Sequence, residues 1–248
     1  MALKRTSIYI DGFNFYYRCL KGTPYKWLDF KSLFLKLLPE DCSILSIKYF
    51  TSHVSALGDP QRPLRQRTYI RALEQYIPEL SVYYGKFLSH PVSMPLANRD
   101  YPEKSREMYH LDAFGKPIFK RVIKTEEKGS DVNIAVHLLN DAWLDKYDCA
   151  VLVSNDSDLA GSISLIKEHH PEREVGLVLP FESNPNERTH STVPSKELMK
   201  RASFIRQVRK GVLADSQLPE RIPNTNIYKP VMWYCDQNVT KKSQNTRQ

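Results

Sequence analysis

Short runs of apolar, β-branched residues alternate along this chain with segments whose apolar residues recur at helical spacing. The apolar runs lie at residues 7–10, 43–54, 80–87, 148–155 and 173–180, and the helical patterns lie at residues 13–20, 28–38, 60–77, 129–143, 158–170 and 195–203. The run DCAVLVSN at 148–155 is apolar through its centre, as in a strand that is buried on both faces of a parallel sheet. The alternation predicts an α/β fold with a central, mostly parallel sheet and helices on both faces.

Two segments depart from this alternation. Residues 88–124 are long and polar for a connection and contain four prolines and many lysines and arginines. A connection of this length is usually functional or disordered. From about residue 211 onward the chain is rich in Pro, Asn, Gln and Lys. We therefore expect a main domain at residues 1–210, carrying an insertion at 88–124, and an extended or disordered basic tail at 211–248.

Composition limits the class of protein. The formal net charge is +8, which attracts polyanions such as nucleic acids but serves solubility equally well. The four cysteines lie far apart without zinc-like spacing, which is typical of free thiols in a reducing cytosol. We find no signal peptide and no apolar run that could span a bilayer, so we expect a cytoplasmic protein without a membrane partner. The oligomeric state stays open, a homo-oligomer included.

Carboxylates follow two of the predicted strands. Asp11 comes directly after the run at 7–10, Asp156 and Asp158 follow the run at 148–155, and Asp131 lies in the first turn of the helix predicted at 129–143. In parallel sheets ligands sit beyond the carboxyl ends of the strands, and a right-handed winding can bring all four residues to one edge. Because clustered carboxylates repel one another, a hard divalent cation, Mg²⁺ or Mn²⁺, is the expected counter-charge.

Each of these residues also has a plainer explanation. Asp158 is equally well placed to cap the helix that follows it, and Asp131 could be a first-turn acid favoured by the helix dipole. Asn14 could be a turn or cap residue. The combination of DGFN after the first strand with SNDSD after a later strand is more specific than any single residue.

The stretches YIDGFNFYY, EEKGSDVNIAVHLLNDAW and VLVSNDSDLAGSISLIKE resemble the NYN domain family, the LabA-like branch of the PIN-like ribonucleases, over roughly residues 5–180. The resemblance implies a Rossmann-like PIN fold and metal-dependent cleavage of RNA. It carries the acidic site onto Asp11, Asp131, Asp156 and Asp158, with Asn14 beside them. Asn155 departs from the family, which commonly has Gly there, and we expect Asn to tolerate a left-handed backbone at that position.

The combined reading is a divalent-metal-dependent endoribonuclease in which the four aspartates hold one or two ions. The metal would activate a water and stabilise the charge that develops on the scissile phosphate. Tyr16 and Tyr17 would offer stacking surfaces for bases, and we expect the insertion to form a β-hairpin or arm flanking the acidic site. Phosphate contacts are expected from basic residues of the insertion and of the helix at 60–77: Lys116, Lys120, Arg121, Lys124, Arg65, Arg67 and Arg71.

Other classes are less consistent with the residues. A haloacid-dehalogenase-like phosphatase needs a second Asp two residues after the first, where this chain has Phe13. The glycine patterns of dinucleotide-binding and P-loop folds are absent from the sequence. A non-catalytic nucleic-acid-binding or scaffold protein that keeps the fold remains the alternative, and the RNA target and strand preference stay open.

Overall fold

The computed structural model describes residues 3–98, 108–180 and 194–234. The chain forms two compact units: a main unit of residues 1–85 and 129–248, and a second unit, Lys86–Lys128. Among the described residues, no helix is long and apolar enough to cross a membrane.

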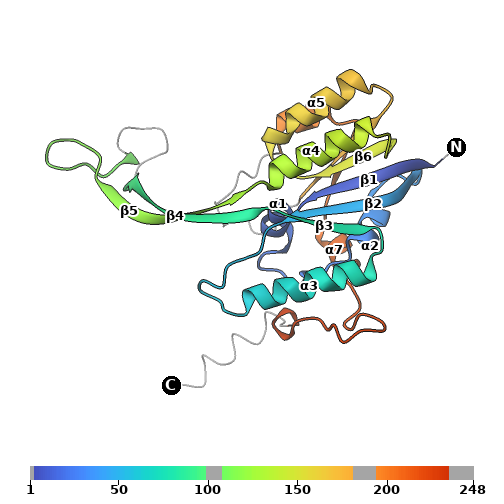
Figure 1. Cartoon of the computed structure of the whole chain (residues 1–248), viewed down its shortest axis with the longest axis horizontal. Helices are drawn as coiled ribbons and strands as arrows, with labels where there is room; N and C mark the ends of the chain where they lie inside the picture. Colours follow the sequence, from blue (N-terminus) through green and yellow to red (C-terminus); the bar gives the residue numbers. More distant parts are fainter. Residues whose placement is uncertain (1–2, 99–107, 181–193, 235–248) are drawn as a thin grey trace. The chain divides into compact units, whose positions relative to one another are not determined.

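A six-stranded sheet in the order β3-β2-β1-β6-β7-β8 forms the centre of the main unit (Figure 1). All five strand pairings are parallel. The strands are β1 (Lys4–Asp11), β2 (Cys42–Thr51), β3 (Leu80–Tyr84), β6 (Cys149–Val153), β7 (Glu174–Leu179) and β8 (Phe204–Gln207). The predicted α/β fold with a parallel sheet is confirmed, whereas β8, a short and largely exposed edge strand, was not predicted.

Helices cover both faces of this sheet because side chains alternate along each strand. Ile8 and Ile10 of β1 pack with α1 (Gly12–Phe15), α2 (Phe30–Leu37) and α3 (Arg62–Tyr76), while Tyr9 packs on the other face. That face is covered by α4 (Ser130–Trp143), α5 (Ala160–His169) and α6 (Lys196–Arg201). Figure 1 shows α4 and α5 on one side of the sheet and α2, α3 and α7 (Lys210–Ala214) on the other.

A buried ion pair fastens α4 to the sheet. Lys48 of β2 donates to Asp141 Oδ2 of α4, and Tyr9 Oη of β1 donates to the same oxygen at 2.7 Å. Asp141 and Tyr9 are almost completely buried. Burial alone would raise the pKa of Asp141, but the hydrogen bonds from Lys48 and Tyr9 outweigh it and lower that pKa. The pair therefore holds a charged side chain in the layer between helix and strands.

The prediction of an extended or disordered tail is wrong for residues 211–234, which pack into the core of the main unit. Leu213, Leu218 and Ile222 are buried in the same core as α2 and α3. Trp27 Nε1 donates to the Pro219 carbonyl at 2.8 Å, and the Trp27 and Trp233 rings lie 6.1 Å apart. Spaced apolar anchors thus bind a segment whose composition resembles that of a linker. The rest of the predicted tail, 235–248, lies outside the described residues.

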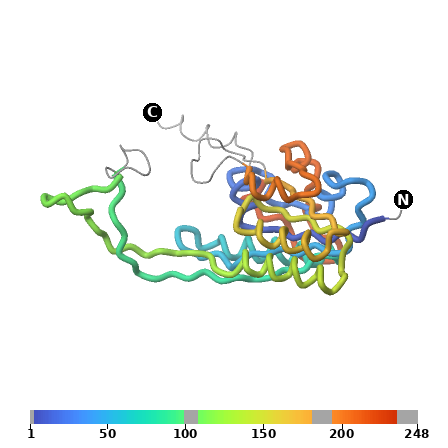
Figure 2. The backbone as a smooth tube through the Cα atoms, turned by 90° about the horizontal axis from the view of Figure 1, so that it is seen from above, coloured from blue at the N-terminus to red at the C-terminus, as the bar shows by residue number. Residues whose placement is uncertain are grey.

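The second unit is a β-hairpin. β4 (Lys86–Pro95) pairs antiparallel with β5 (Phe119–Lys128), from Lys86 opposite Lys128 to Pro95 opposite Phe119. Figure 2 shows the two strands running side by side. The expected hairpin is thereby confirmed for the insertion, with bounds slightly wider than 88–124. That it flanks the acidic site stays a prediction.

Candidate active site

The two central strands place the acidic residues at one edge of the sheet. The order of the strands reverses between β1 and β6, and this switch point is where parallel sheets bind ligands. Ile10 of β1 pairs with Val153 of β6. Asp11 and Ser154 are therefore the neighbouring residues at the carboxyl ends of the two strands.

Asp11 is held in one orientation by two hydrogen bonds. Its Oδ1 accepts from the Asn14 backbone N–H at 3.0 Å, which caps α1, and its Oδ2 accepts from Ser154 Oγ at 2.9 Å. The residue is 5% exposed. Burial, aided by the charges of Asp131 and Asp156, raises its pKa to about 7, although the two hydrogen bonds lower it. Asp11 is thus a carboxyl that becomes ionised only near neutral pH.

The position of Asp11 at the end of β1 requires a glycine at the next residue, Gly12. A Cβ at Gly12 would lie 2.5 Å from the Phe50 carbonyl oxygen and 2.8 Å from the Tyr49 ring. The chain must therefore leave β1 without a side chain immediately after Asp11.

Ser154 links Asp11 to the second acidic motif. The Asp156 backbone N–H donates to Ser154 Oγ at 3.1 Å, while the same hydroxyl donates to Asp11. Ser154 is completely buried. Sequence reasoning did not single it out, although a hydroxyl directly after a buried strand and before two acids was the available signal.

The two acids of SNDSD have different environments. Asp156 Oδ1 accepts from the Asp158 backbone N–H at 3.0 Å, so Asp156 caps the short 3₁₀ helix η3 (Ser157–Leu159). The cap that the sequence suggested at Asp158 is therefore formed two residues earlier, by Asp156. Asp158 itself is exposed in the first turn of η3.

Asp131 reaches the site from α4. Gly129, the residue before the helix, has φ of 97°, a left-handed conformation that favours glycine. Asp131 follows in the first turn, and its charge acts on Asp11. The structure therefore brings Asp11, Asp131 and Asp156 within electrostatic reach of one another, with Asp158 beside Asp156.

Two asparagines connect the loops around these acids. Asn14 Oδ1 accepts from the Asn155 backbone N–H at 3.3 Å, and Asn155 Oδ1 accepts from the Ser195 N–H at 2.8 Å. The left-handed backbone considered for Asn155 is not adopted, because the described non-glycine residues with positive φ are Asp145 and Asn224. Asn155 instead uses its amide to hold the residue that caps α6.

The aspartates offer only carboxylate oxygens, the ligands that hard divalent cations prefer, and Asp11 forms no ion pair with a described Lys or Arg. The carboxylates are not, however, already arranged as a metal-binding site. Within the described ranges, no group of three or more His, Cys, Asp or Glu side chains is placed to hold a metal ion. One reason is visible at Asp11, whose two oxygens both accept hydrogen bonds.

The basic residues predicted to bind nucleic acid do not share one face of α3, nor one face of β5. On α3, Arg67 and Arg71 lie within about 40° of each other around the helix axis, whereas Arg65 lies on another side and pairs with Asp59. The three arginines therefore do not form one basic face of α3. On β5, Lys120 and Lys124 share one face and Arg121 lies on the opposite face, and Lys116 precedes the strand. Lys124 also pairs with Glu126 at 2.6 Å.

The comparison with protein families agrees with this geometry. The NYN domain model matches residues 5–193, most of the chain. The chain belongs to the NYN domain family. The match covers all four aspartates: Asp11 ends β1, Asp131 lies in the first turn of α4, Asp156 caps η3 and Asp158 lies within η3.

Two individual proteins are similar to this NYN domain protein. A Pseudomonas putida protein named 6-hydroxy-3-succinoylpyridine 3-monooxygenase HspA is 35% identical over 256 residues, which cover 93% of this chain and 75% of that protein. The crystal structure of a protein of unknown function, VPA0982 from Vibrio parahaemolyticus, has a TM-score of 0.49 and 18% identity, and the match covers 87% of this chain and 97% of that one.

Proposed function

We propose that this NYN domain protein is a divalent-metal-dependent endoribonuclease that hydrolyses RNA at the site formed by Asp11, Asp131 and Asp156. The observation that supports this most is the state of Asp11: a buried carboxyl, flanked by two further acids, whose pKa is raised to about 7. A carboxyl that is costly to ionise in the free protein is one that a cation would favour in its charged form. Family membership supports the same class of chemistry.

Asp11, Asp131 and Asp156 would hold the Mg²⁺ or Mn²⁺, with Asp158 at the exposed rim. When bound, such an ion lowers the pKa of a water and stabilises developing charge on a phosphate. Ser154 and the Asn14 N–H keep the Asp11 carboxylate oriented. Asn14 and Asn155 hold the two loops together, so that the acids from β1 and β6 stay in register.

The deciding experiment is cleavage of a labelled single-stranded RNA by the purified chain with Mn²⁺ or Mg²⁺. We expect EDTA to abolish cleavage, and Asp11→Asn and Asp156→Asn to lower the rate at least a hundredfold. Asp112→Asn, which changes an exposed acid of the hairpin, should cleave like wild type. Equal rates for wild type and Asp11→Asn would remove the proposal and leave the non-catalytic binding protein.

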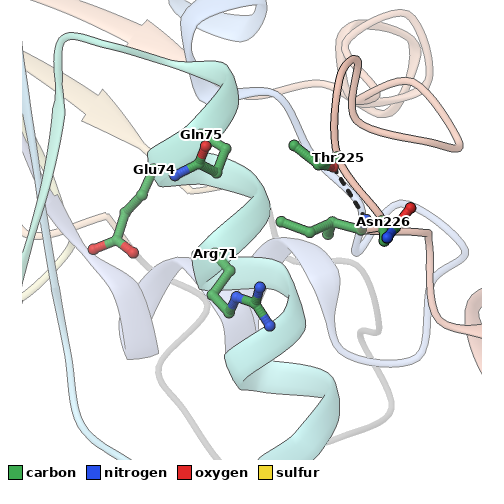
Figure 3. Close-up of a pocket in the computed structure, with 6 residues that line it drawn as sticks. Arg71, Glu74, Gln75, Thr225 and Asn226 are labelled. Carbon is green, nitrogen blue, oxygen red and sulfur yellow. Dashed lines mark hydrogen bonds between the residues drawn. The ribbon is translucent and has the colours of Figure 1, made fainter.

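A second candidate function is oxygenation of a small heteroaromatic acid, and the 35% identity to a protein named as a monooxygenase favours it. Such a reaction places one atom of O₂ on the substrate and releases the other as water, using two electrons from a reductant. A polar cavity of about 290 Å³ lies between α3 and residues 225–227 (Figure 3). Arg71 could pair there with a carboxylate, beside Gln75 and Asn226.

This cavity does not adjoin the acidic site. Its α3 residues lie in the second half of that helix, which runs back from the carboxyl edge of the sheet toward β3. The glycine pattern of dinucleotide-binding folds is also absent from the sequence. The test is substrate-dependent consumption of O₂ and NADH with 6-hydroxy-3-succinoylpyridine, with and without added flavin. Turnover that Arg71→Gln lowers and Asp11→Asn preserves would favour this candidate over the nuclease.

A further inference from the structure

The turns that follow Asp11 expose two aromatic rings. After the four residues of α1 the helix widens into a π-helical turn, η1 (Tyr16–Leu20), while Cys19 and Leu20 remain buried. Tyr16 and Tyr17 are 37% and 46% exposed. Single π turns occur often at functional sites. Here the turn presents both tyrosines within about two helical turns of the acidic site.

The rings are braced against each other. Tyr16 and Tyr17 meet edge to face with centroids 5.4 Å apart. Phe13, one turn earlier, stacks on Tyr17 at 6.4 Å. The two tyrosines are thus partly ordered before any ligand arrives, which lowers the entropy lost when a flat ring stacks on them.

Positive side chains surround these rings. Lys21 Nζ lies 5.4 Å from the centroid of the Tyr17 ring. Burial and the neighbouring Tyr17 raise the pKa of Tyr16, while the charges of Arg62, Lys21 and Arg65 act in the opposite direction. Burial lowers the pKa of Lys26, and the charge of Arg65 lowers it further. Lys21 and Arg62 therefore contribute positive charge around Tyr16. Lys26 adds to it near Arg65, which acts on both Tyr16 and Lys26 and is itself paired with Asp59.

We infer that Tyr16, Tyr17, Lys21, Lys26 and Arg62, which we call the aromatic–basic patch, bind a single-stranded segment of nucleic acid beside the acidic site. The inference rests on the proposed function in one respect: it takes the acidic site as the place of cleavage and RNA as the strand. Unpaired bases stack on Tyr16 and Tyr17, and the cations contact the phosphates.

The combination of exposed rings and cations favours single-stranded over double-stranded nucleic acid as the ligand. Base faces are covered by neighbouring pairs in a duplex, so exposed tyrosines gain stacking energy only from unpaired bases. The patch also supplies the positive charge that an acidic cleavage site lacks.

The test measures binding of a short fluorescent single-stranded RNA in EDTA, so that no cleavage intervenes. We expect Tyr16→Leu with Tyr17→Leu to weaken binding about tenfold or more, and Tyr16→Phe with Tyr17→Phe to bind like wild type. Tyr228→Leu is the matched control, because Tyr228 is 53% exposed and also has a cation, Arg221, over its ring. Lys21→Gln with Arg62→Gln should flatten the salt dependence by about 0.7 for each lost phosphate contact, whereas Arg221→Gln, at the control ring Tyr228, should not.

A further variant distinguishes a lost binding surface from a protein that fails to fold. Tyr17→Trp keeps a stacking ring, and RNA should quench the added indole emission relative to wild type. The inference is overturned if the leucine pair binds RNA like wild type, if Tyr228→Leu loses as much affinity, if the Tyr17→Trp emission does not respond to RNA, or if a blunt duplex of the same length binds equally well. Failure of the nuclease proposal would look different: RNA would bind through the patch but stay intact with Mn²⁺.

Discussion

Ser154 Oγ donates a 2.9 Å hydrogen bond to Asp11 Oδ2 across the switch point between β6 and β1. The same hydroxyl accepts the Asp156 N–H, so one buried side chain orients an acid from one motif and the backbone of the other. This relationship explains why the two motifs act as one site although 143 positions separate Ser154 from Asp11.

Ser154→Ala should therefore destabilise the protein by about 1–3 kcal/mol, since it leaves a buried carboxyl oxygen and a backbone N–H without their shared partner. Equilibrium urea unfolding measures this loss. Ser157→Ala, at the exposed start of η3, is the control and should change stability little. A Ser154→Ala variant as stable as this control would show that the hydroxyl does not hold Asp11.

Because of Asp11, the free energy of unfolding should decrease as the pH rises. Its pKa is about 7 in the folded protein and 3.8 when unperturbed, so between these values the folded state binds more protons than the unfolded state. The contribution is fully favourable below about pH 4 and is lost as the pH passes about 7. Asp11→Asn, compared with wild type by urea unfolding, should gain about 4 kcal/mol of relative stability across this window. A difference independent of pH would contradict the raised pKa.

Divalent cations should stabilise the protein more at about pH 8 than at about pH 5.5, because metal ligands must be ionised. The readout is the melting temperature with Mn²⁺, Mg²⁺ or EDTA. Asp131→Asn should reduce the shift, and the exposed Asp112→Asn should retain it. An equal shift in the Asp131→Asn and wild-type proteins would locate the cation elsewhere.

The buried ion pair between Lys48 and Asp141 should contribute more to the stability of the fold than a surface ion pair does. Asp141→Leu alone should cost about 3–5 kcal/mol, because it leaves Lys48 as an uncompensated charge in the α4 layer, and Lys48→Met should cost less, because Lys146 still pairs with Asp141 at 3.3 Å. The double variant should recover much of that loss. Glu197→Gln, which removes the exposed pairs with Arg201 and Lys200, should cost less than about 1 kcal/mol. If the single and double variants lost stability additively, the two side chains would not be coupled.

Several features could be predicted from the sequence because local signals carry them. Strands buried on both faces are apolar throughout, as in β6, and acids directly after such strands must lie at the carboxyl edge. The parallel sheet and the convergence of Asp11, Asp131 and Asp156 follow from those signals. Ser154 was missed because a hydroxyl acts through its partners, which only the β1–β6 pairing reveals.

Other features depend on long-range packing that composition does not record. Residues 211–234 resemble a linker but pack against Trp27 through a few spaced apolar side chains. β8 is too short and too exposed to give a strand pattern. The arginines of α3 are close in sequence, yet helical geometry and the Asp59 pair separate Arg65 from Arg67 and Arg71.

The hairpin should be removable without unfolding the main unit. The Cα of Gly85 lies 3.9 Å from the position that a Cβ on Gly129 would occupy, so the two ends of the insertion are adjacent. The hairpin also exposes large apolar side chains, Ile123 at 69% and Phe119 at 57%, rather than burying them in a core of its own. Replacing Lys86–Lys128 with a short Gly/Ser linker should therefore preserve cooperative unfolding of the main unit.

The same deletion should weaken RNA binding if the hairpin supplies phosphate contacts. We expect the slope of log affinity against log salt to fall by about 0.7 for each lost contact with a single strand. Lys120→Gln tests one face of β5 and Arg121→Gln the other, because neighbouring strand residues point to opposite faces. The variant that reproduces part of the deletion's change in slope identifies the binding face. Unchanged affinity and slope in the deleted protein would show that the hairpin does not bind RNA.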